Sequence, residues 1–92
     1  MDYIIMEDFK RLLVLIKSIQ DAIQDPLKIN FFDDYNLTIW SNSIVIHKRK
    51  LGSVYGETIA NGILESLIWM FDNNIDAKMI VNNIEEFLLS NV

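Results

Sequence analysis

Apolar residues near the N-terminus recur at alternating steps of four and three, which is the spacing of a helix that packs along one side. The positions in this stripe are Ile5, Phe9, Leu12, Ile16, Ile19 and Ile23, and Leu13 and Leu15 widen it. Pro26 disfavours helical geometry at the residue before it and has no amide hydrogen to donate. The pattern therefore predicts a helix over residues 3–25 that stops at the proline.

Between residues 28 and 50 the apolar spacing shortens to two, as in strands. Residues 28–33 predict a short first strand, and the "DDYN" that follows offers turn chemistry. The next two strands form a hairpin with Ser41 and Asn42 as its loop. The core face of this hairpin then pairs Leu37 and Ile39 with Ile46 and Ile44. The opposite, half-polar face carries Thr38, Trp40, Val45 and His47.

Two helices are predicted for the rest of the chain. Gly52 and Gly56 break the strand, and Ser53 is a suitable cap for a helix over about residues 54–72. The break after this helix is at Asn73 and Asn74.

Asp76 can cap a third helix that reaches about residue 90, and Ile75 can pack against Ile80 as a hydrophobic staple. Its apolar stripe consists of Ala77, Ile80, Val81, Ile84, Phe87 and Leu88.

These elements predict a small α+β fold of order α-β-β(-β)-α-α, with an antiparallel hairpin or three-stranded meander packed against three helices. The chain has 92 residues, which suits a single domain over 1–92. Hydrophobic residues make up 51% of it, more than so small a monomer easily buries. We therefore expect a homodimer.

Composition also bears on the compartment. The longest fully apolar run, residues 12–16, is far shorter than the about 20 residues that span a bilayer. The acidic start lacks the pattern of an export signal, and the chain has no cysteine. We expect a cytoplasmic protein that does not enter a membrane.

Candidate catalytic and ligand-binding patterns are weak. His47 is the only histidine, so a histidine metal cluster is impossible. Gly52, Gly56 and Thr58 fall short of a phosphate-binding loop, because Glu57 stands where such loops carry a lysine. The sequence therefore predicts no metal, no cofactor and no enzymatic activity.

A basic run, Lys48, Arg49 and Lys50, closes the hairpin and has His47 before it. It lies in a chain with thirteen acidic and eight basic residues and a net charge of −5. Charged residues commonly guard an exposed sheet edge, and we interpret the run chiefly in this way. The alternatives are an anionic partner protein and a nucleic-acid interface in which Trp40 stacks on a base.

Two other features point to a protein partner. On the predicted second helix Trp69 falls within a polar stripe of Thr58, Asn61, Glu65 and Asp72, and Trp40 lies on the outer face of the sheet. One interpretation of Trp69 is that the sheet or the first helix covers it. The other is that it anchors a partner, because tryptophan is enriched among residues that dominate interface energy. Asp21 and Asp25 are predicted one turn apart at the C-terminal end of the first helix, where the dipole disfavours acids, and Asp33 and Asp34 are close in sequence. These four aspartates are either solvated surface or an acidic patch that faces a basic partner.

The function expected from these residues is that of a small, acidic, non-enzymatic interaction protein. An inhibitor, antagonist or adaptor of this kind would occlude a basic surface of another macromolecule, with negative charge speeding association. Frequent asparagine and isoleucine suggest an AT-rich source such as a phage or mobile element. The alternative is a nucleic-acid-binding module that uses residues 47–50.

Overall fold

A computed structural model of the chain describes residues 3–52 and 56–90. The helices are α1 (Tyr3–Gln20), α2 (Ile63–Asp72) and α3 (Ala77–Ser90). The strands are β1 (Leu27–Phe31), β2 (Tyr35–Ile39), β3 (Ile44–Lys48) and β4 (Glu57–Asn61). This order confirms the α+β class with three helices and an antiparallel sheet, and the sheet has four strands.

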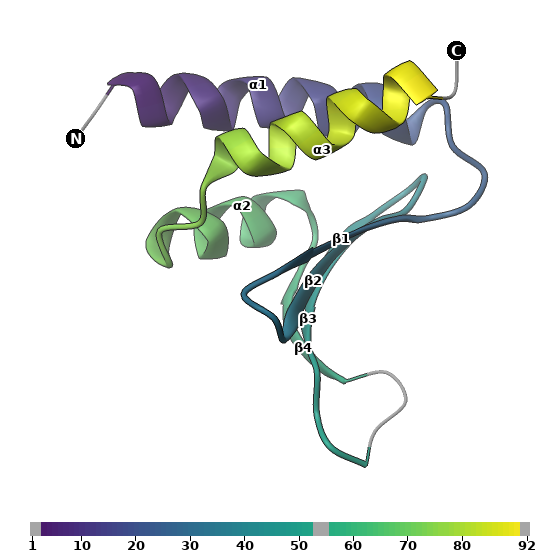
Figure 1. The fold of residues 1–92 in the computed structure, drawn as a ribbon, viewed down its shortest axis with the longest axis vertical. Helices are drawn as coiled ribbons and strands as arrows, with labels where there is room; N and C mark the ends of the chain where they lie inside the picture. The colour runs from purple at the N-terminus through teal and green to yellow at the C-terminus, as the bar shows by residue number, and fades with distance from the viewer. Residues whose placement is uncertain (1–2, 53–55, 91–92) are drawn as a thin grey trace.

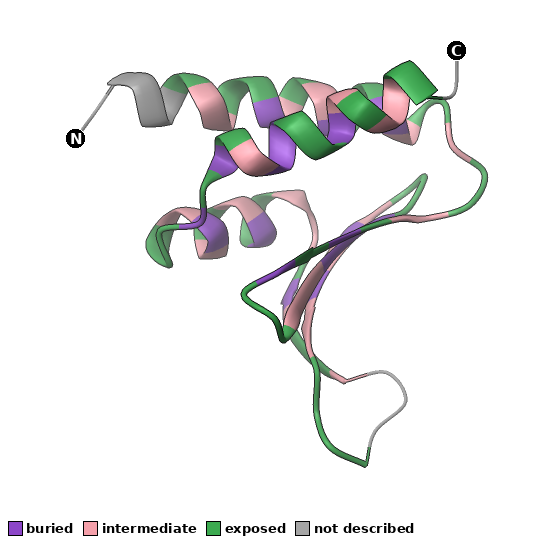
Figure 2. Ribbon diagram, in the orientation of Figure 1, coloured by how far each residue is buried: buried purple, intermediate pink, exposed green. Residues whose placement is uncertain are grey.

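The four strands follow one another in the order β1-β2-β3-β4, each antiparallel to the next. All three helices lie on one side of the sheet, with α1 and α3 side by side and α2 nearer the strands (Figure 1). Residues buried in the interior line the inward sides of these elements, whereas the loop tips and outer helix faces are exposed (Figure 2). Alternating strand residues and one stripe of each helix therefore share a single core.

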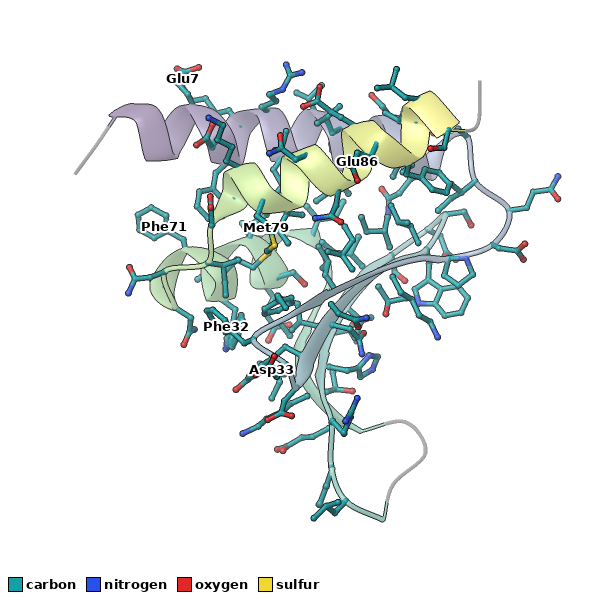
Figure 3. All side chains as sticks on the ribbon, viewed as in Figure 1. Glu7, Phe32, Asp33, Phe71, Met79 and Glu86 are labelled. Carbon is teal, nitrogen blue, oxygen red and sulfur yellow. The ribbon has the colours of Figure 1, made fainter. Side chains whose placement is uncertain are left out.

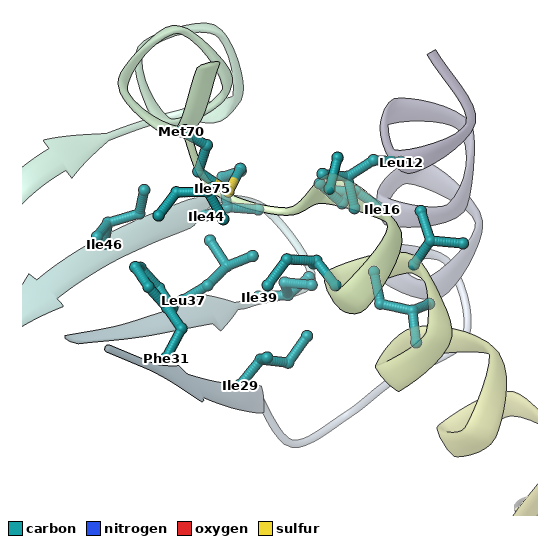
Figure 4. Packing of buried hydrophobic residues seen from close by; sticks show 14 of the residues in the cluster. Leu12, Ile16, Ile29, Phe31, Leu37, Ile39, Ile44, Ile46, Met70 and Ile75 are labelled. Carbon is teal, nitrogen blue, oxygen red and sulfur yellow. The ribbon is translucent and has the colours of Figure 1, made fainter. Parts of the chain in front are cut away.

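The core confirms most of the predicted apolar positions. In the β2–β3 hairpin Leu37 pairs with Ile46 and Ile39 with Ile44, and all four side chains are fully buried. Figure 4 shows these side chains between the sheet and the helices, where they meet Leu12 and Ile16 of α1. The fully buried helix residues include Leu12, Ile16, Ile19, Met70, Ile80 and Ile84.

The third helix begins and ends where the sequence predicts. Asp76 Oδ1 accepts a hydrogen bond from the Lys78 backbone N at 3.1 Å, which satisfies one of the free amides at the start of α3. Asn73 caps the end of α2, and Asn74 follows in left-handed geometry with φ 56°. Ile75 is buried beside the core, as a staple residue should be.

The first helix is shorter than predicted, because α1 ends at Gln20 instead of residue 25. The Gln20 Nε2 amide donates to the backbone oxygens of Trp40 at 2.9 Å and Ser43 at 3.1 Å. These bonds attach the helix end to the β2–β3 hairpin, and the chain then turns away towards β1. Asp21 is therefore the first residue after the helix and Asp25 lies further along the chain, so the prediction of two aspartates one turn apart on the helix was wrong.

The predicted helix over 54–72 was also wrong at its start. Glu57–Asn61 is instead the strand β4, and α2 begins only after Gly62, whose φ is 99°. The proposed cap Ser53 lies outside the described residues. Thr58 and Asn61 belong to this strand and not to the helix of Trp69, so the predicted polar stripe of four helical residues around Trp69 was wrong.

β4 also overturns the edge-strand interpretation of the basic run. β3 pairs with β2 on one side and with β4 on the other, so Lys48 ends an interior strand. The edges are β1, which carries an exposed Lys28, and β4. The register of β4 shifts between Ile46 and His47 and leaves Ile59 as the extra residue of a bulge. Lysine and bulges both hinder further strand pairing.

In the part of the chain that the structure describes, no helix combines the length and the apolar character needed to cross a membrane.

Candidate functional site

The predicted protein-binding residues fall at the two opposite ends of the sheet. Trp40 and the aspartates Asp21 and Asp25 lie at the end that carries the β2–β3 loop, where Gln20 holds the backbone of Trp40. Trp69, Asp33 and Asp34 lie at the other end, beside the β1–β2 turn formed by residues 32–34. The structure therefore divides the predicted set into two surfaces.

At the end that carries residues 32–34, four aromatic rings form a cluster of Phe31, Phe32, Tyr35 and Trp69, which we call the aromatic cluster. Phe31 and Tyr35 oppose each other across β1 and β2 and stack with centroids 5.5 Å apart. Trp69 of α2 packs on Tyr35 at 5.3 Å and on Phe31 at 6.2 Å. Trp69 is therefore half-buried by contacts within the chain, and it anchors α2 to the sheet.

These ring separations leave no space for a ligand inside the aromatic cluster, since rings at 5.3 to 6.2 Å are in contact. The Lys48 Nζ ammonium lies 5.6 Å from the centroid of the Tyr35 ring. That distance allows a cation–π contact between Lys48 and Tyr35, two residues of the same chain.

Phe32 is the most exposed member of the aromatic cluster, with 58% of its surface accessible. It lies in the turn after β1 with φ 50°, and Asp33 beside it has φ 63°. Left-handed geometry is unfavourable for a residue with a Cβ and is unusual for a bulky one. Figure 3 shows Phe32 and Asp33 at this turn, with Phe32 below α2 in the view. The fold thus holds an aromatic ring in solvent at a conformational cost.

Two acidic residues follow this ring in the turn. Asp33 and Asp34 are both exposed, and the Asp34 N donates to Phe32 O at 2.6 Å within the turn. The Arg49 N donates to Asp34 O at 2.7 Å, which joins the segment after β3 to the turn. The turn and the start of the segment after β3 border a hollow of about 410 Å³. Its lining residues are Asn30, Phe31, Phe32, Asp33, Asp34, Tyr35, Asn36 and Arg49.

The structure does not gather the alternative nucleic-acid residues into one basic patch. Lys48 lies on the helix-facing side of β3 and contacts Tyr35, whereas His47 lies on the opposite side and pairs with Asn36. Arg49 borders the hollow that Asp33 and Asp34 also line. Lys50 is exposed and is not among the residues that line this hollow.

At the far end of the sheet Trp40 is 43% exposed on the half-polar outer face. On that face Val45 and His47 are half-buried, and Thr38 is covered although it faces away from the helices. The Thr38 hydroxyl donates to Asn36 Oδ1 at 2.8 Å, so its polar atom is satisfied.

Sequence reasoning missed Phe32. The signal was present, because Phe32 follows Phe31 directly and breaks the alternation of β1 just before two aspartates. Among the described residues no group of three or more histidine, aspartate or glutamate side chains could hold a metal ion. Comparison of the chain with protein-family models, curated proteins and solved structures finds no match.

Proposed function

We propose that this chain is a non-enzymatic interaction protein, an inhibitor, antagonist or adaptor, that occludes a basic surface of another macromolecule through the β1–β2 turn. The observation that carries the proposal is the exposed ring of Phe32, the member of the aromatic cluster that stands in left-handed geometry next to Asp33. Unfavourable backbone geometry clusters at functional sites, and an exposed aromatic ring on a rigid base is a suitable interface anchor.

The aspartates of the turn supply the second element of the proposal. Asp33 and Asp34 add two negative charges beside the ring, against the one positive charge of Arg49 on the same hollow, in a chain whose net charge is −5. Complementary charge at the edge of an interface mainly raises the association rate. A partner with lysine or arginine around an apolar depression fits both features.

The two tryptophans predicted as anchors lie in different places relative to the turn. Trp69 supports the site from beneath, because its ring packs on Phe31 and Tyr35. Trp40, with Asp21 and Asp25 at the other end of the sheet, remains a separate candidate surface. The homodimer, the cytoplasmic location and the phage or mobile-element origin remain predictions from the sequence.

The test is affinity capture of the tagged protein from its host, with and without nuclease, at physiological salt. We expect one stoichiometric protein that survives nuclease and is lost with Phe32→Ser. Leu89→Ser is the matched control, since Leu89 is also an exposed apolar residue but lies on α3. Capture that is unchanged by Phe32→Ser and lost with Trp40→Ala would move the site to the other end of the sheet.

Capture of nucleic acid, or loss of all protein partners with nuclease, would instead support the alternative function. Binding would then weaken steeply with salt and collapse when Lys48 and Arg49 are changed to glutamate.

A further inference from the structure

α2 carries an apolar surface that the fold does not cover. Leu64 and Ile68 are 73% and 52% exposed, and they lie one turn apart on the same side of the helix. At about 100° per residue this side is opposite Ser66 and Met70, which face the core. We call Leu64 and Ile68, with the acids Glu65 and Asp72 beside them, the outer face of α2.

Every charged residue of α2 is acidic. The helix has the sequence ILESLIWMFD, in which Glu65 and Asp72 are the only ionisable groups. Glu65 is exposed, and its Oε2 accepts a hydrogen bond from the Asn61 backbone N at 3.1 Å, which limits its orientation. Asp72 is exposed at the last position of a helix with no basic residue in its last turn. An acid there is unfavourable with respect to the helix dipole, and a neighbouring cation would relieve the cost.

A second copy of this chain is a poor occupant for this surface. A twofold axis that pairs Leu64 with Ile68 of another copy passes outside α2, at the level of Ser66 but on the opposite side of the helix from its buried side chain. Glu65 is one residue from that level, so the two Glu65 side chains would lie on the same flank of the interface. Like charges at an interface oppose binding.

We infer that the outer face of α2 binds an amphipathic helical segment of a partner protein, with leucine-like residues on Leu64 and Ile68 and lysine or arginine beside Glu65 and Asp72. The inference rests on the proposed function in one respect, namely that the partner is a protein with a basic surface. α2 is attached to the turn site through Trp69, which packs on Phe31 and Tyr35. One partner can therefore contact both surfaces.

The test uses a synthetic peptide of leucine and lysine at helical spacing, about 14 residues or roughly four turns long. A leucine and glutamate peptide of the same pattern is the control. Each is titrated into the ¹⁵N-labelled full chain, and amide shifts are followed by NMR. We expect the lysine peptide alone to bind and to shift the amides of α2.

The affinity should fall about tenfold or more in the double variant Leu64→Ser with Ile68→Ser, because both apolar anchors are lost. Glu65→Gln should weaken binding about threefold and reduce its salt dependence. Leu89→Ser, on α3, should bind as the unchanged protein does. These are surface positions, so all variants are expected to stay folded, and their amide spectra report whether they do.

No binding of the lysine peptide, shifts confined to the β1–β2 turn, or unchanged affinity in the double variant would overturn the inference. So would a dimer of the free protein, detected by light scattering, that dissociates in the double variant. A captured host partner that depends on Phe32 but not on Leu64 would leave the proposed function standing and refute only this extension.

Discussion

The left-handed geometry of Phe32 can be tested by comparing Phe32→Gly with Phe32→Ala. Both variants lose the ring and its contacts, so these losses largely cancel in the comparison. Left-handed geometry costs a residue with a Cβ about 1–2 kcal/mol, whereas at ordinary backbone angles glycine is about 0.4–1 kcal/mol less favourable than alanine. With φ at 50°, we expect the glycine variant to be more stable by about 0.5–1 kcal/mol.

The assay is urea unfolding followed by far-ultraviolet circular dichroism. With a slope of roughly 1–2 kcal/mol/M for a small domain, the glycine midpoint should be about 0.5 M higher than the alanine midpoint. Gln24 is the matched control, because it is exposed in an irregular segment and its φ is not positive. There the glycine variant should be the less stable one. If glycine is also the less stable residue at position 32, the strained turn is absent and the structural basis of the proposed site is refuted.

The Ser66 hydroxyl is fully buried, and no described residue provides a hydrogen-bond partner for it, so Ser66→Ala should stabilise the protein by about 1–2 kcal/mol. Ser18→Ala, an exposed control, should change thermal stability little, and destabilisation by Ser66→Ala would show that the hydroxyl is satisfied. A Cβ on Gly56 would lie 2.5 Å from a β3 carbonyl oxygen, whereas one on Gly52 would meet nothing within 4 Å. Gly56→Ala should therefore destabilise the fold about 1–3 kcal/mol more than Gly52→Ala in urea unfolding, and equal losses would contradict the β3–β4 arrangement. Gln20→Ala removes two bonds to the hairpin and should cost about 1–2 kcal/mol, with faster amide exchange in the β2–β3 loop as the specific readout. Unchanged exchange there would argue against this attachment.

The β2–β3 hairpin and α3 could be predicted because their signals are local. The alternation of strand residues and a two-residue loop set the hairpin register. For α3, a capping aspartate, Asp76, and one continuous apolar stripe define the start and the buried side. The break between α2 and α3 followed in the same way from Asn73 and Asn74.

β4 could not be predicted from its own residues. Its sequence ETIAN has two apolar residues in succession, Ile59 and Ala60, which satisfy a helical period as readily as a strand with a bulge. Pairing with β3 decides the outcome, because an unpaired edge of β3 would expose its backbone groups. The interior position of Lys48 follows from that pairing alone.

The candidate site shows the same division between sequence and structure. The sequence alone determined that the chain is acidic, that it is a small α+β domain, and that Asp33 and Asp34 lie in a turn. Only the tertiary structure decided which rings of β1 and β2 cover Trp69, that Phe32 remains exposed, and that Leu64 and Ile68 face outwards. The physical reason is that periodicity reports the buried side of each element separately. Which apolar side chains stay uncovered depends on contacts between elements that are distant in the sequence.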